Sequence, residues 1–184
     1  QTFTYPEVTT IDTFYTNSDG YLITPEKLEY GTGYSLVEVS APYGYTLNSE
    51  PVYFDVTADN ATEENAVTVV EVTKPNMAQK GVIRISKSGE VFSSVTEADG
   101  TYQPVFAVKG LAGAVYEITA AEDIITPDGT LRYAAGEVVD TVTADETGLA
   151  ESKPLYLGKY EVREISAPTG YVLNTEIHTA ELVY

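Results

Sequence analysis

The chain has no cysteine, no tryptophan and only one methionine among its 184 residues, and His178 is its single histidine. The absence of cysteine excludes disulfide bonds, zinc–thiolate sites and thiol nucleophiles. One histidine, without a serine at a glycine-flanked elbow, does not predict a hydrolase triad. We therefore expect no enzyme that turns over a substrate, no bound metal and no other cofactor.

Positive charge is also scarce, with 10 Lys and Arg residues against 28 Asp and Glu residues and a formal net charge of −18. Such a chain repels nucleic acids and anionic lipid surfaces. No apolar run approaches the roughly 20 residues that span a bilayer, and no basic stretch precedes an apolar one at the N-terminus. We expect neither a nucleic-acid partner nor membrane insertion, and a signal or anchor only in a larger precursor.

Strand and turn signals are frequent instead. Asp-Gly pairs, which favour tight hairpin turns, occur at Asp19-Gly20, Asp99-Gly100 and Asp128-Gly129 beside β-prone residues. The 15 tyrosines and many threonines suit half-buried strand surfaces. These features predict an all-β sandwich, with one short helical turn near residues 120–124.

The chain contains an internal repeat. YSLVEVSAPYGYTLNSE (Tyr34–Glu50) matches YEVREISAPTGYVLNTE (Tyr160–Glu176) at an offset of 126 positions (160 − 34 = 126), and Thr2–Thr13 matches Thr130–Thr141 with a small gap. A repeat of this length indicates tandem copies of one folding unit.

The repeat also suggests a frame for the modules. Residues 80–129 of the second copy have no counterpart in the first, and residues 59–76 of the first have none in the second. We expect residues 1–76 to be the C-terminal part of one module without its N-terminal strands. Residues 77–81 are then a short linker, and residues 82–184 a second module without its last strand.

Charged residues share the apolar faces of three predicted strands. YSLVE and YEVRE end in Glu38 and Glu164, which alternate in phase with the apolar residues before them, and VIRISK ends in Lys87 on the face of Ile83 and Ile85. A buried unpaired charge is costly, so each must pair, become neutral or react. Alternatively, the lysine reaches water at the strand end and the glutamates lie at a sheet edge.

Lys87, followed by LAGAVYEI (Leu111–Ile118) and then YEVREISAPTGYVL, closely resembles the Cna B-type, or SpaA-type, prealbumin-like modules of Gram-positive pilins and surface adhesins. The resemblance covers nearly the whole chain. It implies tandem immunoglobulin-like β-sandwiches of an extracellular, cell-wall-associated protein.

The resemblance also implies a chemistry. In such modules a first-strand lysine condenses with a last-strand asparagine or aspartate, and a glutamate of the E-x-x-A-P segment promotes the reaction. Lys87 matches the lysine, Glu164 and Glu38 match the promoting acids, and Asn76 is the acceptor that we select. Burial favours the neutral amine and the neutral acid that this single-turnover reaction needs.

The choice of Asn76 depends on alternation, because Val70 and Val72 share its parity. Thr73 occupies the other position and cannot react, whereas Pro75 interrupts the strand and favours the alternative that Asn76 is a linker residue. Under the expected frame, Lys87 has no later acceptor strand and Asn76 no earlier lysine strand.

Two recurring features are interpreted as structural. Asn48 and Asn174 follow the Gly-Tyr segment of each repeat, where asparagine commonly bonds its own backbone. The Ala-Pro pairs that precede Gly44 and Gly170 indicate turns.

Three functions remain open at this stage. The first is a structural spacer of a surface adhesin or pilin-like protein, whose partners are the neighbouring modules of the same polypeptide. The second is a module that binds glycan or host matrix protein through exposed tyrosines. The third is an accessory β-domain of the transthyretin type. Tandem copies favour the spacer.

Overall fold

The computed structural model describes residues 8–58 and 68–184. Its regular elements are all strands, which confirms the all-β prediction. The strands are β1 (Gly31–Leu36), β2 (Val52–Val56), β3 (Lys80–Gly81), β4 (Arg84–Ser86), β5 (Ser88–Ala98), β6 (Thr101–Gly110), β7 (Val115–Ala120), β8 (Ile124–Ile125), β9 (Leu131–Tyr133), β10 (Val138–Thr143), β11 (Leu149–Glu151), β12 (Leu155–Tyr156), β13 (Gly158–Ser166) and β14 (Ile177–Leu182). Within the described ranges, no helix has the length and apolar character to cross a membrane.

The chain divides into two compact units. Unit 1 comprises Gln1–Val37 and Ser49–Lys74, and unit 2 comprises Glu38–Asn48 and Pro75–Tyr184. The division follows packing rather than the repeat, so the expected module limits at residues 76 and 82 stay a prediction.

Unit 1 contains the antiparallel pair of β1 and β2. Tyr34 lies opposite Phe54, and their rings stack with centroids 5.7 Å apart. A register shift follows Gly31, where the backbone N–H of Gly33 donates to Oδ1 of Asp55 at 2.7 Å. Residues 2–7, which are half of the Thr2–Thr13 repeat segment, lie outside the described residues, as do residues 59–67.

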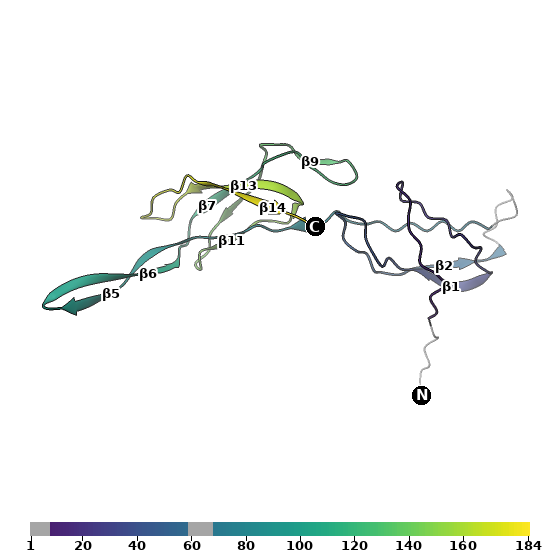
Figure 1. Ribbon diagram of the computed structural model, residues 1–184, viewed down its shortest axis with the longest axis horizontal. Helices are drawn as coiled ribbons and strands as arrows, with labels where there is room; N and C mark the ends of the chain where they lie inside the picture. The colour runs from purple at the N-terminus through teal and green to yellow at the C-terminus, as the bar shows by residue number, and fades with distance from the viewer. Residues whose placement is uncertain (1–7, 59–67) are drawn as a thin grey trace, which may run out of the picture. The chain divides into compact units, whose positions relative to one another are not determined.

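Unit 2 is built on a four-stranded antiparallel sheet with the order β10-β7-β13-β14 (Figure 1). The short pairs β11–β4 and β12–β3 supply the strands that pack against it. On the central strands β7 and β13, every second residue is buried, as period-2 alternation requires. The inner face of β13 ends in Glu164, so the sheet itself carries a carboxylate toward the core.

The core of unit 2 draws residues from both layers, as expected for a sandwich. Its buried members are Ile83, Ala114, Tyr116, Ile118, Ala120, Ile124, Val139, Ala144, Ala150, Leu155, Tyr160 and Val162.

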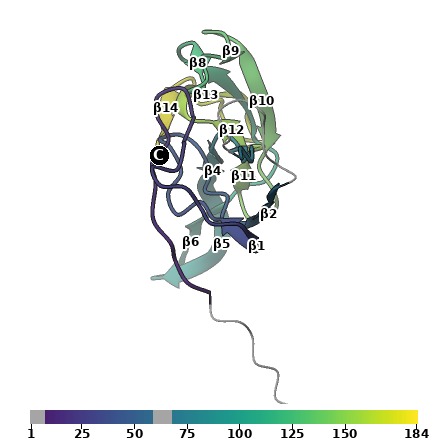
Figure 2. The same cartoon turned by 90° about the vertical axis from the view of Figure 1, so that its right-hand side faces the viewer.

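The Asp-Gly pairs have three different settings. Asp99-Gly100, both with positive φ (52° and 75°), joins β5 to β6 as the sequence predicts. Asp128-Gly129 lies in the loop between β8 and β9. Asp19-Gly20 lies in a tight turn that no described strand flanks. In Figure 2 the β8–β9 and β5–β6 hairpins lie at opposite ends of unit 2.

The helical turn expected near residues 120–124 is wrong. β7 continues to Ala120, a bend follows, and β8 begins at Ile124. The backbone N–H of Ala120 donates to Glu137 and that of Ala121 to Lys159, both at 2.9 Å. The carbonyl of Ala120, which a helical turn starting there needs as its acceptor, instead accepts the N–H of Gly136 at 2.8 Å.

Candidate functional site

Lys87 and Glu164 form a buried ion pair in unit 2. Nζ of Lys87 lies 2.8 Å from Oε1 of Glu164, and the two side chains are 16% and 2% exposed. The approach of the Lys87 amine to the Glu164 carboxylate, expected from strand alternation, is therefore confirmed. The alternatives, a lysine that reaches water and a glutamate at a sheet edge, do not apply to this pair.

The backbone fixes Lys87 on both sides. Its N–H donates to the carbonyl of Gly148 at 2.7 Å, and its carbonyl accepts from the N–H of Leu111 at 3.0 Å. Gly148 must be glycine here, because it has a φ of +82° and a Cβ would lie 2.2 Å from the carbonyl oxygen of Lys87. Gly110 is equally constrained, since a Cβ would lie 1.8 Å from the carbonyl oxygen of Thr147.

Glu164 lies at a shift in register near the end of β13, opposite Tyr116 of β7. Its Oε2 accepts the backbone N–H of Asn174 at 2.7 Å. Burial raises the pKa of the Tyr116 hydroxyl, and the nearby charge of Glu164 raises it further. Oε1 has no hydrogen-bond donor in the part of the chain that the structure describes, since its contact with Lys87 is an ion pair only.

The first repeat holds its glutamate in the same way. Oε2 of Glu38 accepts the backbone N–H of Asn48 at 2.7 Å, the distance found for the Asn174 contact. Nδ2 of Asn76 lies 2.9 Å from Oε1 and 2.7 Å from Oε2 of the same carboxylate, and it also donates to the carbonyl of Thr46 at 3.0 Å. All of these residues belong to unit 2.

The segment that leads to Asn76 alternates between half-buried and exposed residues, as a strand does. The prediction that it is a regular last strand is nevertheless wrong. Residues 69–77 have no strand assignment, whereas Val70, Val72 and Asn76 are half-buried and Thr73 and Pro75 are exposed. Pro75 lacks an N–H and cannot donate to a ladder, although its carbonyl accepts from Nδ2 of Asn48 at 3.2 Å. Asn76 nevertheless points inward, at variance with the linker interpretation.

The four selected residues thus form two pairs, Lys87 with Glu164 and Asn76 with Glu38. The contribution of Asn48 and Asn174 was missed in part. The Oδ1 of Asn174 accepts the nearby N–H of Glu176 at 3.0 Å, as expected, whereas Nδ2 of Asn48 donates to the distant carbonyl of Pro75. The backbone N–H groups of both asparagines anchor the two glutamates. The sequence signal was the spacing of ten residues from glutamate to asparagine, which recurs in both repeats.

Both Ala-Pro segments form the expected turns. The N–H of Tyr45 donates to Pro42 at 3.1 Å and that of Tyr171 to Pro168 at 3.0 Å, with positive φ at the glycine between. These turns return the chain from each glutamate toward its asparagine.

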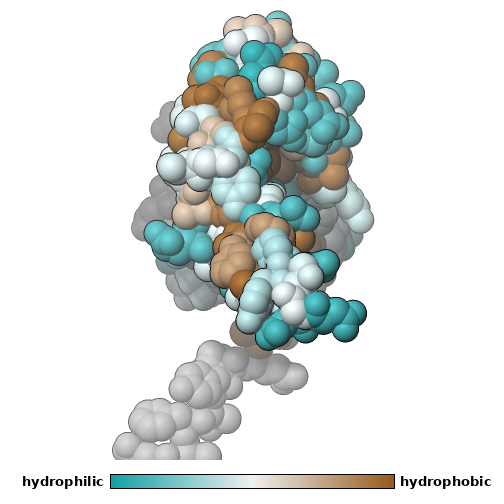
Figure 3. Space-filling model, turned by 90° about the vertical axis from the view of Figure 1, so that its left-hand side faces the viewer, coloured by the Kyte–Doolittle hydropathy of each residue, from teal (hydrophilic) through white to brown (hydrophobic). Residues whose placement is uncertain are grey.

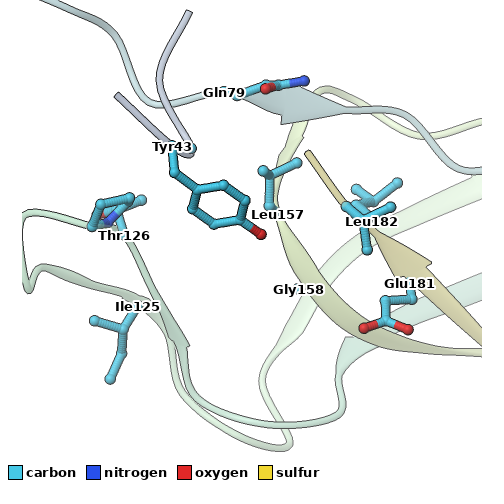
Figure 4. Close-up of a pocket in the computed structure, with 11 residues that line it drawn as sticks. Tyr43, Gln79, Ile125, Thr126, Leu157, Gly158, Glu181 and Leu182 are labelled. Carbon is cyan, nitrogen blue, oxygen red and sulfur yellow. The ribbon is translucent and has the colours of Figure 1, made fainter. Parts of the chain in front are cut away.

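Unit 2 also has a shallow cleft of about 220 Å³ beside the turn at Gly44 (Figure 4). The ring of Tyr43 reaches toward Leu157 there, and it also packs on Tyr184 with centroids 5.0 Å apart. Gly44 approaches Pro127 so closely that a Cβ would lie 2.7 Å from Cγ of the proline. The cleft is lined by residues of β8, β13 and β14 as well as by loops, and its lining includes neither Lys87 nor either glutamate of the two pairs.

A profile of the SpaA family, described as a prealbumin-like fold domain, matches residues 2–76 and 107–183. These segments cover more than half of the chain and both copies of the repeat, so the chain belongs to this family. The match confirms the resemblance and the prealbumin-like fold of both modules.

The chain is similar to parts of two other proteins. The trypsin-resistant surface T6 protein of Streptococcus pyogenes serotype M6 is 41% identical over 44 residues, which are 24% of this chain and 8% of that protein. The solved structure of the Bacillus anthracis TIE protein is 28% identical and has a TM-score of 0.47, with 84% of this chain and 23% of that one covered. The chain therefore spans a small part of each relative.

Proposed function

We propose that this chain is a structural spacer of a cell-surface adhesin or pilin-like protein, of the type stabilised by intramolecular Lys–Asn isopeptide bonds. One observation carries the proposal. Glu164 and Glu38, each held by a backbone N–H at 2.7 Å, face an amine in one repeat and a carboxamide in the other. These are the two reactants of an amide exchange.

The chemistry follows from the groups in the two pairs. The neutral amine of Lys87 attacks Cγ of an asparagine, a new C–N bond forms, the bond to the amide nitrogen breaks, and ammonia leaves. Transfer of one proton from Lys87 to Glu164 within the pair gives the neutral amine and the neutral acid. Glu164 then gives its proton to the departing amide nitrogen and takes one from the attacking amine. Asn76, beside Glu38, is the acceptor in its own module. The reaction occurs once per module, so the chain is no turnover enzyme.

The spacer role draws on the family and on one relative. Membership of the SpaA family and similarity to a streptococcal surface protein support an extracellular, cell-wall-associated location. Tandem copies of one module extend a chain without adding a new site, and they make neighbouring modules the first partners. A covalent bond within each sandwich then resists unfolding by force or protease.

The test builds a complete set of reactants from the chain itself. Glu50 and Glu176 occupy equivalent repeat positions, so residues 51–79 can follow Glu176 in place of residues 177–184. This chimera places a second copy of Asn76 in the module that contains Lys87 and Glu164. We expect spontaneous crosslinking, detected as a peptide that joins the two segments after proteolysis. Lys87→Met in the chimera is the matched control and gives no joined peptide.

A binding role is the second candidate, since exposed aromatic side chains gather on one face of β5 and β6. That face leads to a separate inference.

A further inference from the structure

The β5–β6 hairpin forms a two-stranded sheet of its own in unit 2. Most of it, up to residue 106, lies between the two segments that match the family. Its strands, of 11 and 10 residues, pair with each other and with no other strand in the described ranges. At the base of the hairpin, the N–H of Leu111 donates to the carbonyl of Lys87. The two ends of the hairpin are therefore joined by this bond, whatever the length of the hairpin.

One side of this hairpin is mostly apolar, with a carboxylate toward each end. The register places Phe92 opposite Phe106, Val95 opposite Pro104, Glu97 opposite Tyr102 and Glu90 opposite Val108, and directly opposed residues share a face. We call these eight residues the hairpin face. The five large hydrophobic ones are all more than half exposed: Phe92 57%, Val95 52%, Tyr102 69%, Phe106 54% and Val108 70%.

The hairpin face is ordered at its base. The hydroxyl of Tyr171 donates to the carbonyl of Glu90 at 2.7 Å, and a Cβ on Gly89 would lie 2.9 Å from the ring of Tyr171. Farther out, the rings of Phe92 and Phe106 meet edge to face at 6.3 Å. Figure 3 views the end that carries the hairpin and shows hydrophobic residues exposed beside hydrophilic ones.

The charges around this face define its partner. Glu90 and Glu97 are its only ionisable groups besides the Tyr102 phenol, while Lys109 lies opposite Gly89 on the other side. Seven positions of extended strand place the two carboxylates on the order of 20 Å apart. Between them lie only apolar and aromatic side chains. The surrounding chain, at −18, adds to the negative field.

We propose that the hairpin face is a docking surface for a partner protein that presents an apolar β-strand or hairpin with Lys or Arg at both ends. The basic ends pair with Glu90 and Glu97, and the apolar residues cover the two phenylalanines. This activity goes beyond the spacer role, because it needs no crosslink and uses none of its residues.

Other occupants fit less well. A second copy brings Glu90 and Glu97 against like charges, which disfavours self-association through this face. An anionic membrane is repelled by the same carboxylates. The edges are also poor sites for strand addition, because Pro104 removes a donor from β6 and a bulge follows Phe92 in β5.

The experiment titrates the full chain with two synthetic cyclic hairpin peptides. Both carry valine and phenylalanine on one face, and the ends of that face bear lysine in one peptide and glutamate in the other. We expect the lysine peptide to bind at least tenfold more tightly at low salt, with the preference falling as salt is added. Glu90→Gln with Glu97→Gln should weaken it about three- to tenfold.

Matched variants locate the contact. Phe92→Ser with Phe106→Ser should abolish binding, whereas Thr96→Ala, on the opposite side of the hairpin, should leave it unchanged. Amide exchange at β5 and β6 shows whether each variant keeps the hairpin. Equal binding of the two peptides, no binding of either, or unchanged binding by the double phenylalanine variant with an intact hairpin overturns the proposal. Dimerisation of the chain, measured by sedimentation and lost in the double phenylalanine variant, also contradicts it. So does binding to neutral phosphatidylcholine vesicles.

Discussion

The carboxamide nitrogen of Asn76 lies 2.9 Å and 2.7 Å from the two carboxylate oxygens of Glu38. The same nitrogen also donates to the backbone carbonyl of Thr46 at 3.0 Å. The amide is therefore oriented by three contacts, which leave its carbon rather than its nitrogen open to an attacking group. Under the proposed function, these contacts would position Asn76 as the acceptor.

Asn76→Asp should destabilise the fold around Glu38 more than Asn76→Ala does at pH 7. The new carboxylate cannot donate and lies against a like charge, which raises the pKa of one member of the pair. The excess cost, about 2 kcal/mol in the free energy of unfolding, is present above that pKa and disappears as pH falls through it. Thermal melts of both variants between pH 7 and pH 4 measure it. Parallel losses at every pH contradict the contact.

Glu164→Leu should cost more stability than Lys87→Met. The first change removes the partner of the amine and the acceptor of the Asn174 N–H. The second leaves a carboxyl that keeps the Asn174 bond and can take up a proton. We expect a loss of about 3 kcal/mol for Glu164→Leu and less than half of that for Lys87→Met. Urea unfolding measures both, and a larger loss for Lys87→Met is the contrary result.

Gly110→Ala should disturb the position of Lys87, because its Cβ meets the carbonyl oxygen of Thr147. A shift of backbone is then unavoidable, at about 3 kcal/mol or more. Gly113→Ala is the control, since Gly113 has a φ of +86° but open space around it, and it should cost about 1 kcal/mol. Chemical denaturation of the two variants tests the ranking.

The turn that supports Lys87 should respond to acid. The hydroxyl of Thr147, followed by backbone N–H groups, lowers the pKa of Asp145. A lowered folded-state pKa adds stability above the ordinary value of about 4, and this stability is lost as pH falls through the folded value. Asp145→Asn should therefore melt below the parent chain at pH 7 and converge with it near pH 2. A constant difference across this range contradicts the assignment.

Much of unit 2 could be predicted from the sequence because its signals are local or repeated. Alternation placed Lys87 and Glu164 each on the inner face of its own strand, and the Asp-Gly pair at 99–100 indicated the β5–β6 turn. The repeat located both glutamates at once. The resemblance to SpaA-type modules then suggested the isopeptide chemistry. Periodicity alone left open the alternatives in which the lysine reaches water and the glutamates lie at a sheet edge.

The rest depended on long-range contacts that no local pattern encodes. The helical turn near Ala120 was wrong because the carbonyl of Ala120, the acceptor that such a turn needs, is bonded to the N–H of Gly136. Buried and exposed residues alternate in the segment before Asn76, although it forms no regular strand. Hydrogen bonds from the side chains of Asn48 and Asn76 hold its end instead. The anchoring of each glutamate by a backbone N–H ten residues later could be recognised only after the turn between them was seen.

The most direct measurement of the central claim is the intact mass of the chimera in which residues 51–79 follow Glu176. The account predicts a mass lower by one ammonia than its sequence gives, because Lys87, Glu164 and the added Asn76 then share one module. Lys87→Met, or Asn76→Ala in the added copy, should restore the full mass, as should the unaltered chain, whose Lys87 and Asn76 belong to separate pairs. A folded chimera that keeps its full sequence mass would contradict the account.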